Sequence, residues 1–360
     1  MSTRSRVTRL APVLAVAGLG AALPSAASAA EQIYAVTDQN RLVSVQSDSP
    51  SALRTNLAIS GLTAGETLVG LDVRPATDQL YGLGSQGRLY VVNRTTGNAR
   101  VVGTGAPFAP APNGTGFGFD FNPTVDRIRL VSDAEQDLRL DPNTGATAGV
   151  DGNLAYVAGD RNAGRDPAVT ASAYTNSAIG AATTTLYGID TNTDSLVIQN
   201  PPNAGALGSV GAAPGLGVNV EGPAAFDILA QGNVGYAFLK RTDSARSFLY
   251  RIDLATGRAA PAADNPAIGL VDERTVGAMA ITGQVADDNT APRFSVASSS
   301  TQLRSRLLAR GLELTVACDE TCSFSAELFA GTSREGTANG SVETVGQDRV
   351  AIRLDSEARA

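Results

Sequence analysis

The chain of 360 residues contains no histidine and no tryptophan. Without an imidazole, Ser-His-Asp and Cys-His catalysis is excluded, and so are ordinary zinc sites with histidine ligands. The missing indole removes the strongest aromatic platform on which a sugar ring could stack. Any chemistry or ligand binding therefore has to depend on carboxylates, tyrosine, lysine, arginine or a hard cation.

Positive charge and helix-forming runs are also scarce. There are 28 Lys and Arg residues against 35 Asp and Glu, and the formal net charge is −7. No basic stripe is present to displace counterions from phosphates, so we expect no nucleic-acid partner. The 38 glycines and 17 prolines interrupt the chain frequently. This composition favours an all-β protein with many short strands joined by tight turns.

The N-terminus has the three parts of a secretory signal peptide. Three arginines within the first nine residues precede an apolar run over residues 10–23, and Pro24 and the small residues Ala27-Ser28-Ala29 follow. The alternative is an uncleaved anchor, but the run is shorter than the ~20 residues that span a bilayer. No cysteine lies directly after the cleavage site, so a lipoprotein anchor is not expected there. We therefore predict a signal peptide over residues 1–30 and a secreted or cell-surface, extracytoplasmic protein without a membrane span.

A four-part repeat occupies most of the remaining chain. Residues 68–103 read LVGLDVRP, QLYGLGS, RLYVVN and ARVVG, which predicts four strands, a to d, with hairpin connections. The same order recurs over residues 117–152, 169–211 and 224–263. The second-strand anchors are Tyr81, Arg129, Tyr187 and Tyr236, spaced 48, 58 and 49 residues apart. This period is close to the ~40–50 residues of a propeller blade, whereas β-sandwiches rarely keep one strand order at one period.

The two ends of the repeat predict how the ring closes. The segments IYAVTD, RLVSVQS and TNLAIS match strands b, c and d, and Tyr34 lies 47 residues before Tyr81. At the other end, residues 276–282 (VGAMAIT) match strand a alone. Together they would complete a fifth blade and leave no exposed sheet edge. We therefore predict a five-bladed β-propeller over residues 31–283.

One long motif resembles a known family. The run FGFDFNPTVDRIRLVSDAEQDLRLDPNTG at residues 117–145, with AYTNS and TLYGID after it, is similar to the bacterial exported domain of unknown function 4394. The resemblance covers about residues 32–283. It implies a propeller-like fold and no known activity.

The C-terminal part predicts a second, smaller domain. Residues 284–292 (QVADDNTAP) are polar and predict a linker, and two strands are expected at residues 312–317 and 323–328. Residues 293–360 resemble small Ig-like β-sandwich modules, although they are few for seven strands. Cys318 and Cys322 are the only cysteines. In an exported protein such a pair predicts a disulfide, and the CxxxC spacing disfavours a CxxC redox site.

Three aspartates occupy one position of the repeat. Alignment of the a strands places Asp72, Asp120 and Asp227 together, with Tyr174 and Ala280 in the other two units. Because a strands surround the axis of a propeller, the three carboxylates are expected to converge and to raise one another's pKa values. Ca²⁺ would relieve the repulsion, since it takes six to eight oxygen ligands. The alternative, which we favour over a metal, is that each Asp accepts hydrogen bonds from backbone amides.

These features leave three functions open. We expect an exported, non-catalytic binding or scaffold protein with no catalytic residues, no cofactor unless it is Ca²⁺, and an unknown extracellular protein or glycan as its ligand. The first alternative is a carboxylate-dependent hydrolase of a glycan or lactone, with or without calcium. Such an enzyme needs an acid and a base or nucleophile ~5–9.5 Å apart. The second alternative is a purely structural envelope component.

The cysteine pair generates a direct test. We expect the secreted, unreduced protein to show no reactive thiol when it is denatured and treated with a maleimide, and two after reduction. Two labelled thiols without reduction would contradict the disulfide between Cys318 and Cys322.

Overall fold

The computed structural model describes residues 30–269 and 275–282 completely, and it describes five further strands between residues 294 and 354 by their backbone. The predicted signal peptide, apart from its last residue, and the predicted linker at residues 284–292 lie outside the described residues. The regular secondary structure of the described residues is all β-strand apart from one short 3₁₀ helix, η1 (Pro202–Ala204). No helix in these ranges is long and apolar enough to cross a bilayer.

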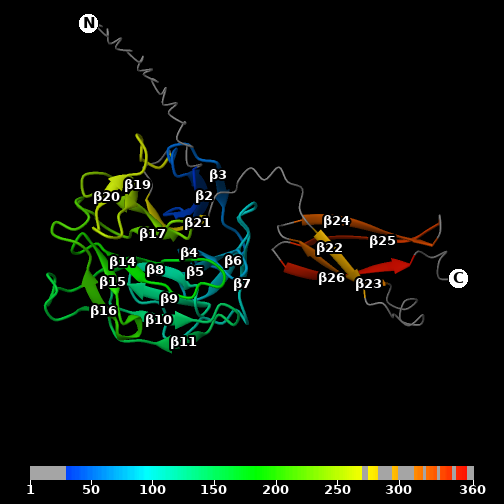
Figure 1. Cartoon of the computed structure of the whole chain (residues 1–360), viewed down its shortest axis with the longest axis horizontal. Coiled ribbons are helices and arrows are strands. Elements are labelled where there is room, and N and C mark those ends of the chain that lie inside the picture. Colours follow the sequence, from blue (N-terminus) through cyan, green and yellow to red (C-terminus); the bar gives the residue numbers. More distant parts are fainter. Residues whose placement is uncertain are drawn as a thin grey trace, which may run out of the picture.

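Five sheets form the blades of a propeller, and the strands of each blade follow one another from the axis to the outer edge (Figure 1). Blade 1 contains β21 (Val276–Thr282), β1 (Gln32–Thr37), β2 (Arg41–Gln46) and β3 (Thr55–Ala58). Blade 2 contains β4 (Leu68–Arg74), β5 (Gln79–Gly84), β6 (Leu89–Val92) and β7 (Ala99–Val101). Blade 3 contains β8 (Phe117–Asn122), β9 (Arg127–Ser132), β10 (Asp137–Leu140) and β11 (Thr147–Val150).

The last two blades follow the same plan. Blade 4 contains β13 (Val169–Tyr174), β14 (Leu186–Asp190), β15 (Ser195–Gln199) and β16 (Ala206–Ser209), and β12 (Ala155–Tyr156) adds a parallel pairing to its outer edge. Blade 5 contains β17 (Ala225–Leu229), β18 (Val234–Lys240), β19 (Ser247–Ile252) and β20 (Ala259–Pro261). The predicted five-blade arrangement is confirmed.

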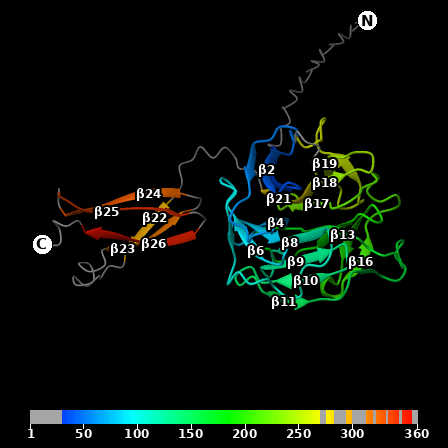
Figure 2. The same ribbon diagram turned by 180° about the vertical axis from the view of Figure 1, so that it is seen from behind.

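The ring closes by the pairing predicted from the sequence. Strand β21 pairs antiparallel with β1, so that Tyr34 lies opposite Ala280 and Gln32 lies opposite Thr282. The first and last strands of the propeller therefore share one sheet. In both views β21 lies next to the blue strands of this blade (Figures 1 and 2). Each inner strand also contacts the inner strand of the next blade around the axis. The chain ends are thus held by the same ladder of hydrogen bonds that builds the other blades.

The hairpin turns contain residues suited to their backbone conformations. The turns between the first and second strands of blades 2, 3 and 5 each place one non-glycine residue in the left-handed region, namely Asp78 (φ 56°), Asp126 (φ 50°) and Asn233 (φ 50°). Asp and Asn are the non-glycine residues that adopt this region most readily. The same turn chemistry therefore recurs in three blades.

The hydrophobic core consists of layers between neighbouring blades. One layer joins blades 1 and 5 through residues such as Ile33 and Phe238, and another joins blades 2 and 3 through Leu83 and Leu130. These side chains are fully buried. At ~25 cal/mol per Å² of buried apolar area, such layers supply most of the stabilisation of a fold.

Close to the axis the layers contain small residues. The positions two residues before the aligned aspartates are Gly70 and Gly118, and alanines occupy the equivalent places in the other blades. A Cβ atom on Gly118 would lie only 2.6 Å from the backbone nitrogen of Ser172 in the next blade. A Cβ atom on Gly70 would lie 2.7 Å from Cβ of Phe119. These glycines therefore allow the inner strands to approach one another.

The C-terminal strands pair in the order β22 (Phe294–Ser298), β23 (Leu312–Cys318), β26 (Gly346–Leu354), β25 (Ser333–Val342) and β24 (Cys322–Ala330). The two strands predicted in this region are confirmed by β23 and β24. Cys318 and Cys322 lie at their facing ends, but their side chains are outside the described residues. The disulfide and the sandwich-like packing stay predictions.

Glycine substitutions near the axis test the close approach of the inner strands. We expect Gly118→Ala to lower the free energy of unfolding by ~1–3 kcal/mol in urea titrations. The added Cβ would lie only 2.6 Å from the backbone nitrogen of Ser172, which cannot easily move away. Gly277→Ala is the matched control on β21, where the nearest heavy atom to an added Cβ is 4.0 Å away. Equal effects of the two substitutions would contradict this account of the packing.

Candidate axial carboxylate site

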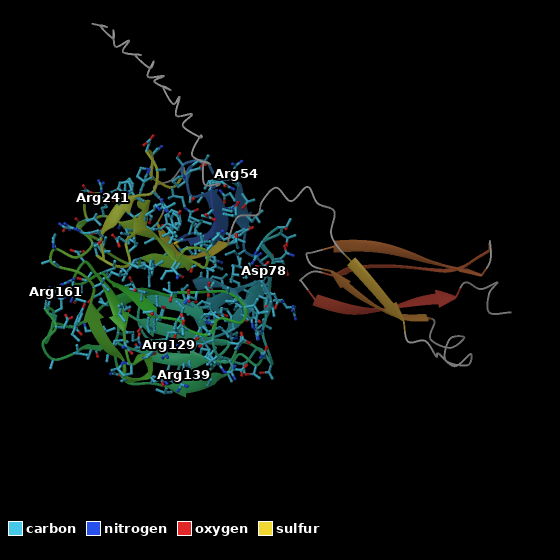
Figure 3. All side chains as sticks on the ribbon, viewed as in Figure 1. Arg54, Asp78, Arg129, Arg139, Arg161 and Arg241 are labelled. Atoms are coloured by element: carbon cyan, nitrogen blue, oxygen red, sulfur yellow. The ribbon has the colours of Figure 1, made fainter. Side chains whose placement is uncertain are left out.

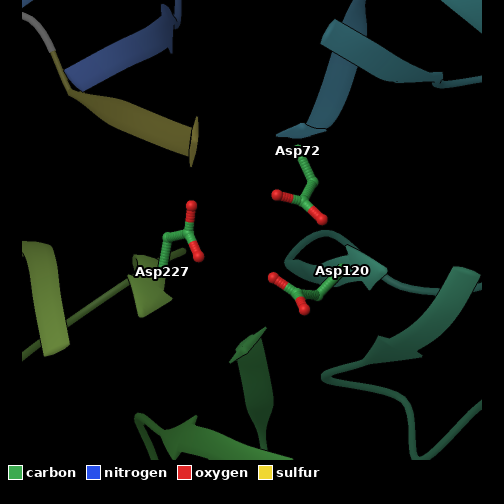
Figure 4. Close-up of side chains that lie close together, drawn as sticks. All are labelled: Asp72, Asp120 and Asp227. Carbon is green, nitrogen blue, oxygen red and sulfur yellow. The ribbon is translucent and has the colours of Figure 1, made fainter. Parts of the chain in front are cut away.

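The three aligned aspartates converge on the propeller axis. Asp72 lies on β4, Asp120 on β8 and Asp227 on β17, and each lies opposite the predicted anchor residue of its second strand. One carboxylate oxygen from each lies within 4.8 Å of the others. Figure 4 shows the three side chains pointing toward one another from three blades. They are only 2%, 2% and 4% exposed, respectively.

The structure corrects one part of the alignment. In blade 4 the residue opposite the anchor Tyr187 is Ala173 and not Tyr174. The pairing of the first and second strands shifts register just before this position in both blade 4 and blade 2, between Val169 and Ala171 and between Leu68 and Gly70. Blade 1 has Ala280 at the equivalent place, as predicted. Alanine therefore replaces aspartate in blades 1 and 4.

The aspartates connect each blade to the next. The amide of Phe121 in blade 3 donates to Oδ2 of Asp72 at 2.7 Å. The amide of Tyr174 in blade 4 donates to Oδ1 of Asp120 at 2.9 Å. The amide of Ile281 in blade 1 donates to Oδ2 of Asp227 at 2.6 Å. In every case the donor is the residue that follows the aligned position on the neighbouring inner strand.

In blades 2 and 5 the inner-strand amide is bonded differently, because the preceding blade has alanine at the aligned position. The amides of Val73 and Ile228 have no aspartate on the preceding blade, and each donates to Oδ1 of the aspartate beside it at 2.6 Å. Three carboxylates thereby satisfy the corresponding amides of all five inner strands. The interpretation that these aspartates bond backbone amides of their own or a neighbouring blade is confirmed.

Burial dominates the electrostatics of the cluster. Loss of solvation raises the pKa of Asp72 well above its usual range, and the charge of Asp227 raises it further. The pKa of Asp120 is also raised well above normal, by burial and by the charges of Asp72 and Asp227. Burial raises the pKa of Asp227 to about 7. The donated amides oppose these shifts. No described lysine or arginine contributes to any of them.

A pocket opens beside the cluster at one end of the axis. Its volume is about 360 Å³, and its wall includes Asp72 and Asp227 together with Asp78, Arg94 and Ser177. Arg94 and Asp78 form an ion pair at 2.9 Å. A second pocket of about 230 Å³ lies at the opposite end of the inner strands. Between them the axis narrows to a space of about 10 Å³.

A second buried charge cluster was not predicted from the sequence. Arg129 on β9 is 2% exposed and donates to Asp137 and Asp151 of its own blade and, at 2.8 Å, to Oδ1 of Asn203 in blade 4. Arg139 completes the cluster by donating to Asp151 from the same side of the propeller (Figure 3). One feature of the sequence could have indicated this cluster, namely that Arg129 occupies the position at which the other four blades have tyrosine.

The fold and the site together define the chain as a closed five-bladed β-propeller with a buried carboxylate cluster on its axis. The chain belongs to the family described as Domain of unknown function (DUF4394), whose sequence profile matches residues 41–280. This match supports the resemblance drawn from residues 117–145. No curated protein shows significant similarity to the chain.

Three solved structures show a weak likeness to the chain. A protein of unknown function from Bacteroides thetaiotaomicron VPI-5482 is 16% identical with a TM-score of 0.38, covering 66% of this chain and 58% of its own. Dihydro-heme d1 dehydrogenase NirN is 9% identical with a TM-score of 0.32, covering 88% and 53%. Kuenenia stuttgartiensis hydrazine synthase is 11% identical with a TM-score of 0.28, covering 81% and 68%. The chain thus spans little more than half the length of the first two.

The Arg129 cluster predicts a pH dependence of stability. Burial raises the pKa of Asp137 to about 6, although the charge of Arg129 opposes the shift. The native state therefore holds a proton more tightly than the unfolded chain, and this contribution to stability is lost as the pH rises from about 4 to about 6. We expect the free energy of unfolding to fall less steeply between about pH 4 and about pH 6 in the Asp137→Asn variant than in the wild type.

Urea titrations at several pH values measure this difference. Asp48→Asn, at an exposed position in blade 1, is the control and should follow the wild-type slope. A slope for Asp137→Asn that equals the wild-type slope would show that Asp137 does not titrate in this range.

Proposed function

We propose that this protein is an exported, non-catalytic binding protein, in which the propeller is a rigid scaffold and the pocket beside Asp72 and Asp227 holds an extracellular ligand. The carrying observation is that the axial carboxylates accept five backbone amides from five blades. This use as structural acceptors leaves the adjoining pocket, the larger of the two at the ends of the axis, as a concave surface that can hold a ligand. Binding sites are typically concave, with a few convergent polar groups.

The same hydrogen bonds argue against the hydrolase alternative. A glycosidase requires one carboxyl group to transfer a proton and a second to attack or to activate water at an accessible bond. Here the candidates are at most 4% exposed, and each accepts at least one amide. Neither role suits a carboxylate that must stay in place to join two blades.

The lining of the pocket favours a glycan as the ligand. Asp78, Arg94, Ser177 and Thr282 offer donors and acceptors that match the hydroxyl groups of a sugar. A volume of about 360 Å³ suits a small polar group at the end of a larger molecule. A protein partner would instead need ~800 Å² of surface on each side. Because the chain has no tryptophan, hydrogen bonds and not stacking would provide the recognition.

Export and the C-terminal module complete the proposal. Residues 1–30 would direct the chain out of the cytoplasm, and the mature chain would act as a secreted or cell-surface protein. Residues 293–360 would form a small Ig-like β-sandwich module, with Cys318 and Cys322 joined in a disulfide.

Substitutions in one loop of blade 4 test the binding pocket. Ala178 lines the pocket and is exposed, whereas its neighbour Ile179 is 77% exposed and does not line it. We expect the mature chain to bind members of a glycan array, and Ala178→Trp to weaken that binding by on the order of tenfold (~1.4 kcal/mol) because the indole fills the pocket. Ile179→Trp is the matched control and should bind as the wild type does.

Two results would contradict the proposal. One is equal binding by the wild type and Ala178→Trp, which would place the ligand elsewhere. The other is turnover of p-nitrophenyl glycosides or of dihydrocoumarin, a lactone, that Asp227→Asn abolishes while the variant still unfolds cooperatively. Such turnover would establish the hydrolase alternative.

A further inference from the structure

We propose that the cluster of Asp72, Asp120 and Asp227 binds a hard divalent cation of the size of Ca²⁺ on the propeller axis. This site adjoins the glycan pocket but does not depend on sugar binding, so it stands whether or not that pocket binds a sugar. Four features of the cluster support it, namely the spacing of the oxygens, the uncompensated charge, a polar side chain without a partner, and a route from solvent.

The spacing of the carboxylate oxygens fits one ion of this size. Calcium binds oxygen at 2.3–2.6 Å, so two ligands on opposite sides of the ion lie ~4.6–5.2 Å apart. The three oxygens lie within 4.8 Å of one another. Magnesium demands near-ideal octahedral geometry at about 2.0–2.1 Å and loses its bound waters reluctantly, so a buried cluster whose carboxylates are held by amides of other blades suits it less well.

The charge of the cluster requires a counter-charge. Three carboxylates lie together in a buried space where no described lysine or arginine contributes to their pKa values. Five backbone amides provide only partial positive charge. Protons or a metal ion must supply the rest, and an exported protein meets calcium at concentrations suited to weak oxygen sites.

Two polar groups beside the axis have no described partner. Oδ2 of Asp120 accepts no hydrogen bond from the described residues, since the amide of Tyr174 donates to Oδ1. The hydroxyl of Ser172 is buried without a partner, and the residue is 2% exposed. An ideal Cβ on Gly118 would lie 2.6 Å from this hydroxyl, so Ser172 points into the axial space that Gly118 leaves open.

Ser172 and Asp120 are connected through adjacent strands. Gly118 and Asp120 lie two residues apart on β8, and Ser172 and Tyr174 lie two residues apart on β13. Ser172 therefore lies in the layer next to Asp120 and lines the narrow axial space of about 10 Å³, which is adjacent to the aspartate layer and is not lined by the three aspartates themselves. A space of this size is about that of one water molecule. In the proposed site, a water bound there hydrogen-bonds Ser172 and faces the ion in the adjoining layer.

The adjoining pocket gives the ion a route from solvent. Asp72 and Asp227 form part of its wall, so a hydrated ion can reach their carboxylates. The ligands are all oxygens, because the chain has no histidine and its two cysteines lie outside the propeller. Such a donor set favours calcium or magnesium over zinc and copper.

Calorimetry on the mature chain tests the site. After treatment with a chelator, titration with CaCl₂ at pH 7.5 should show saturable binding of one ion per chain, with MgCl₂ binding on the order of tenfold more weakly. Calcium should also raise the midpoint of thermal unfolding by mass action, and EGTA should reverse the change.

Two variants and one control assign the binding to this cluster. Asp120→Asn should weaken calcium binding at least about tenfold. Ser172→Ala keeps all three carboxylates, should fold normally because its hydroxyl has no partner, and should weaken binding by up to about tenfold through loss of the ordered water. Asp48→Asn, on the exposed surface of blade 1, should bind as the wild type does.

The outcomes separate the alternatives. Absence of calcium binding at pH 7.5 would overturn the proposal and leave a cluster neutralised by protons. Calcium binding that is unchanged in both Asp120→Asn and Ser172→Ala would place the ion elsewhere and would also overturn it. Calcium binding that persists in Ala178→Trp, whose indole fills the glycan pocket, would support a cation site on the axis that does not depend on that pocket.

Discussion

The hydrogen bonds between axial carboxylates and inner-strand amides are the constraint on which the rest of this propeller depends. Inner strands of neighbouring blades form no ladder with one another, so their amides facing the axis have no backbone partner. A buried amide without a partner costs about 1–3 kcal/mol. Asp72 and Asp227 each accept hydrogen bonds from two amides and Asp120 accepts one, so that three side chains bond one inner-strand amide in each of the five blades.

This arrangement also explains the small residues around the axis. A carboxylate can reach the next blade only if the inner strands lie close together, and Gly70 and Gly118 allow that approach. The same closeness concentrates negative charge in a buried space and raises the pKa values of the three acids. A structural connection between blades therefore creates the conditions for binding a proton or a cation. The pairing of β21 with β1 closes the ring and so keeps the five inner strands close to one another around the axis.

Sequence reasoning located the fold and much of the site because both depend on repetition. The spacing of Tyr81, Arg129, Tyr187 and Tyr236 identified four blades, and the unmatched segments at the two ends identified the fifth. The same alignment selected Asp72, Asp120 and Asp227. It failed at Tyr174, because blade 4 has no aspartate to mark the aligned position, and only the pairing with Tyr187 shows that Ala173 occupies it.

The sequence by itself therefore determined the all-β class, the number of blades, the closure and the identity of the three acids, since each follows from local periodicity. Only the tertiary structure decided what those acids do, because their partners are amides 49 to 54 residues away in other blades. It likewise revealed the buried contacts of Arg129 and the unpartnered hydroxyl of Ser172. Hydrogen-bond partners depend on how blades pack around an axis, and no pattern within one strand records that packing.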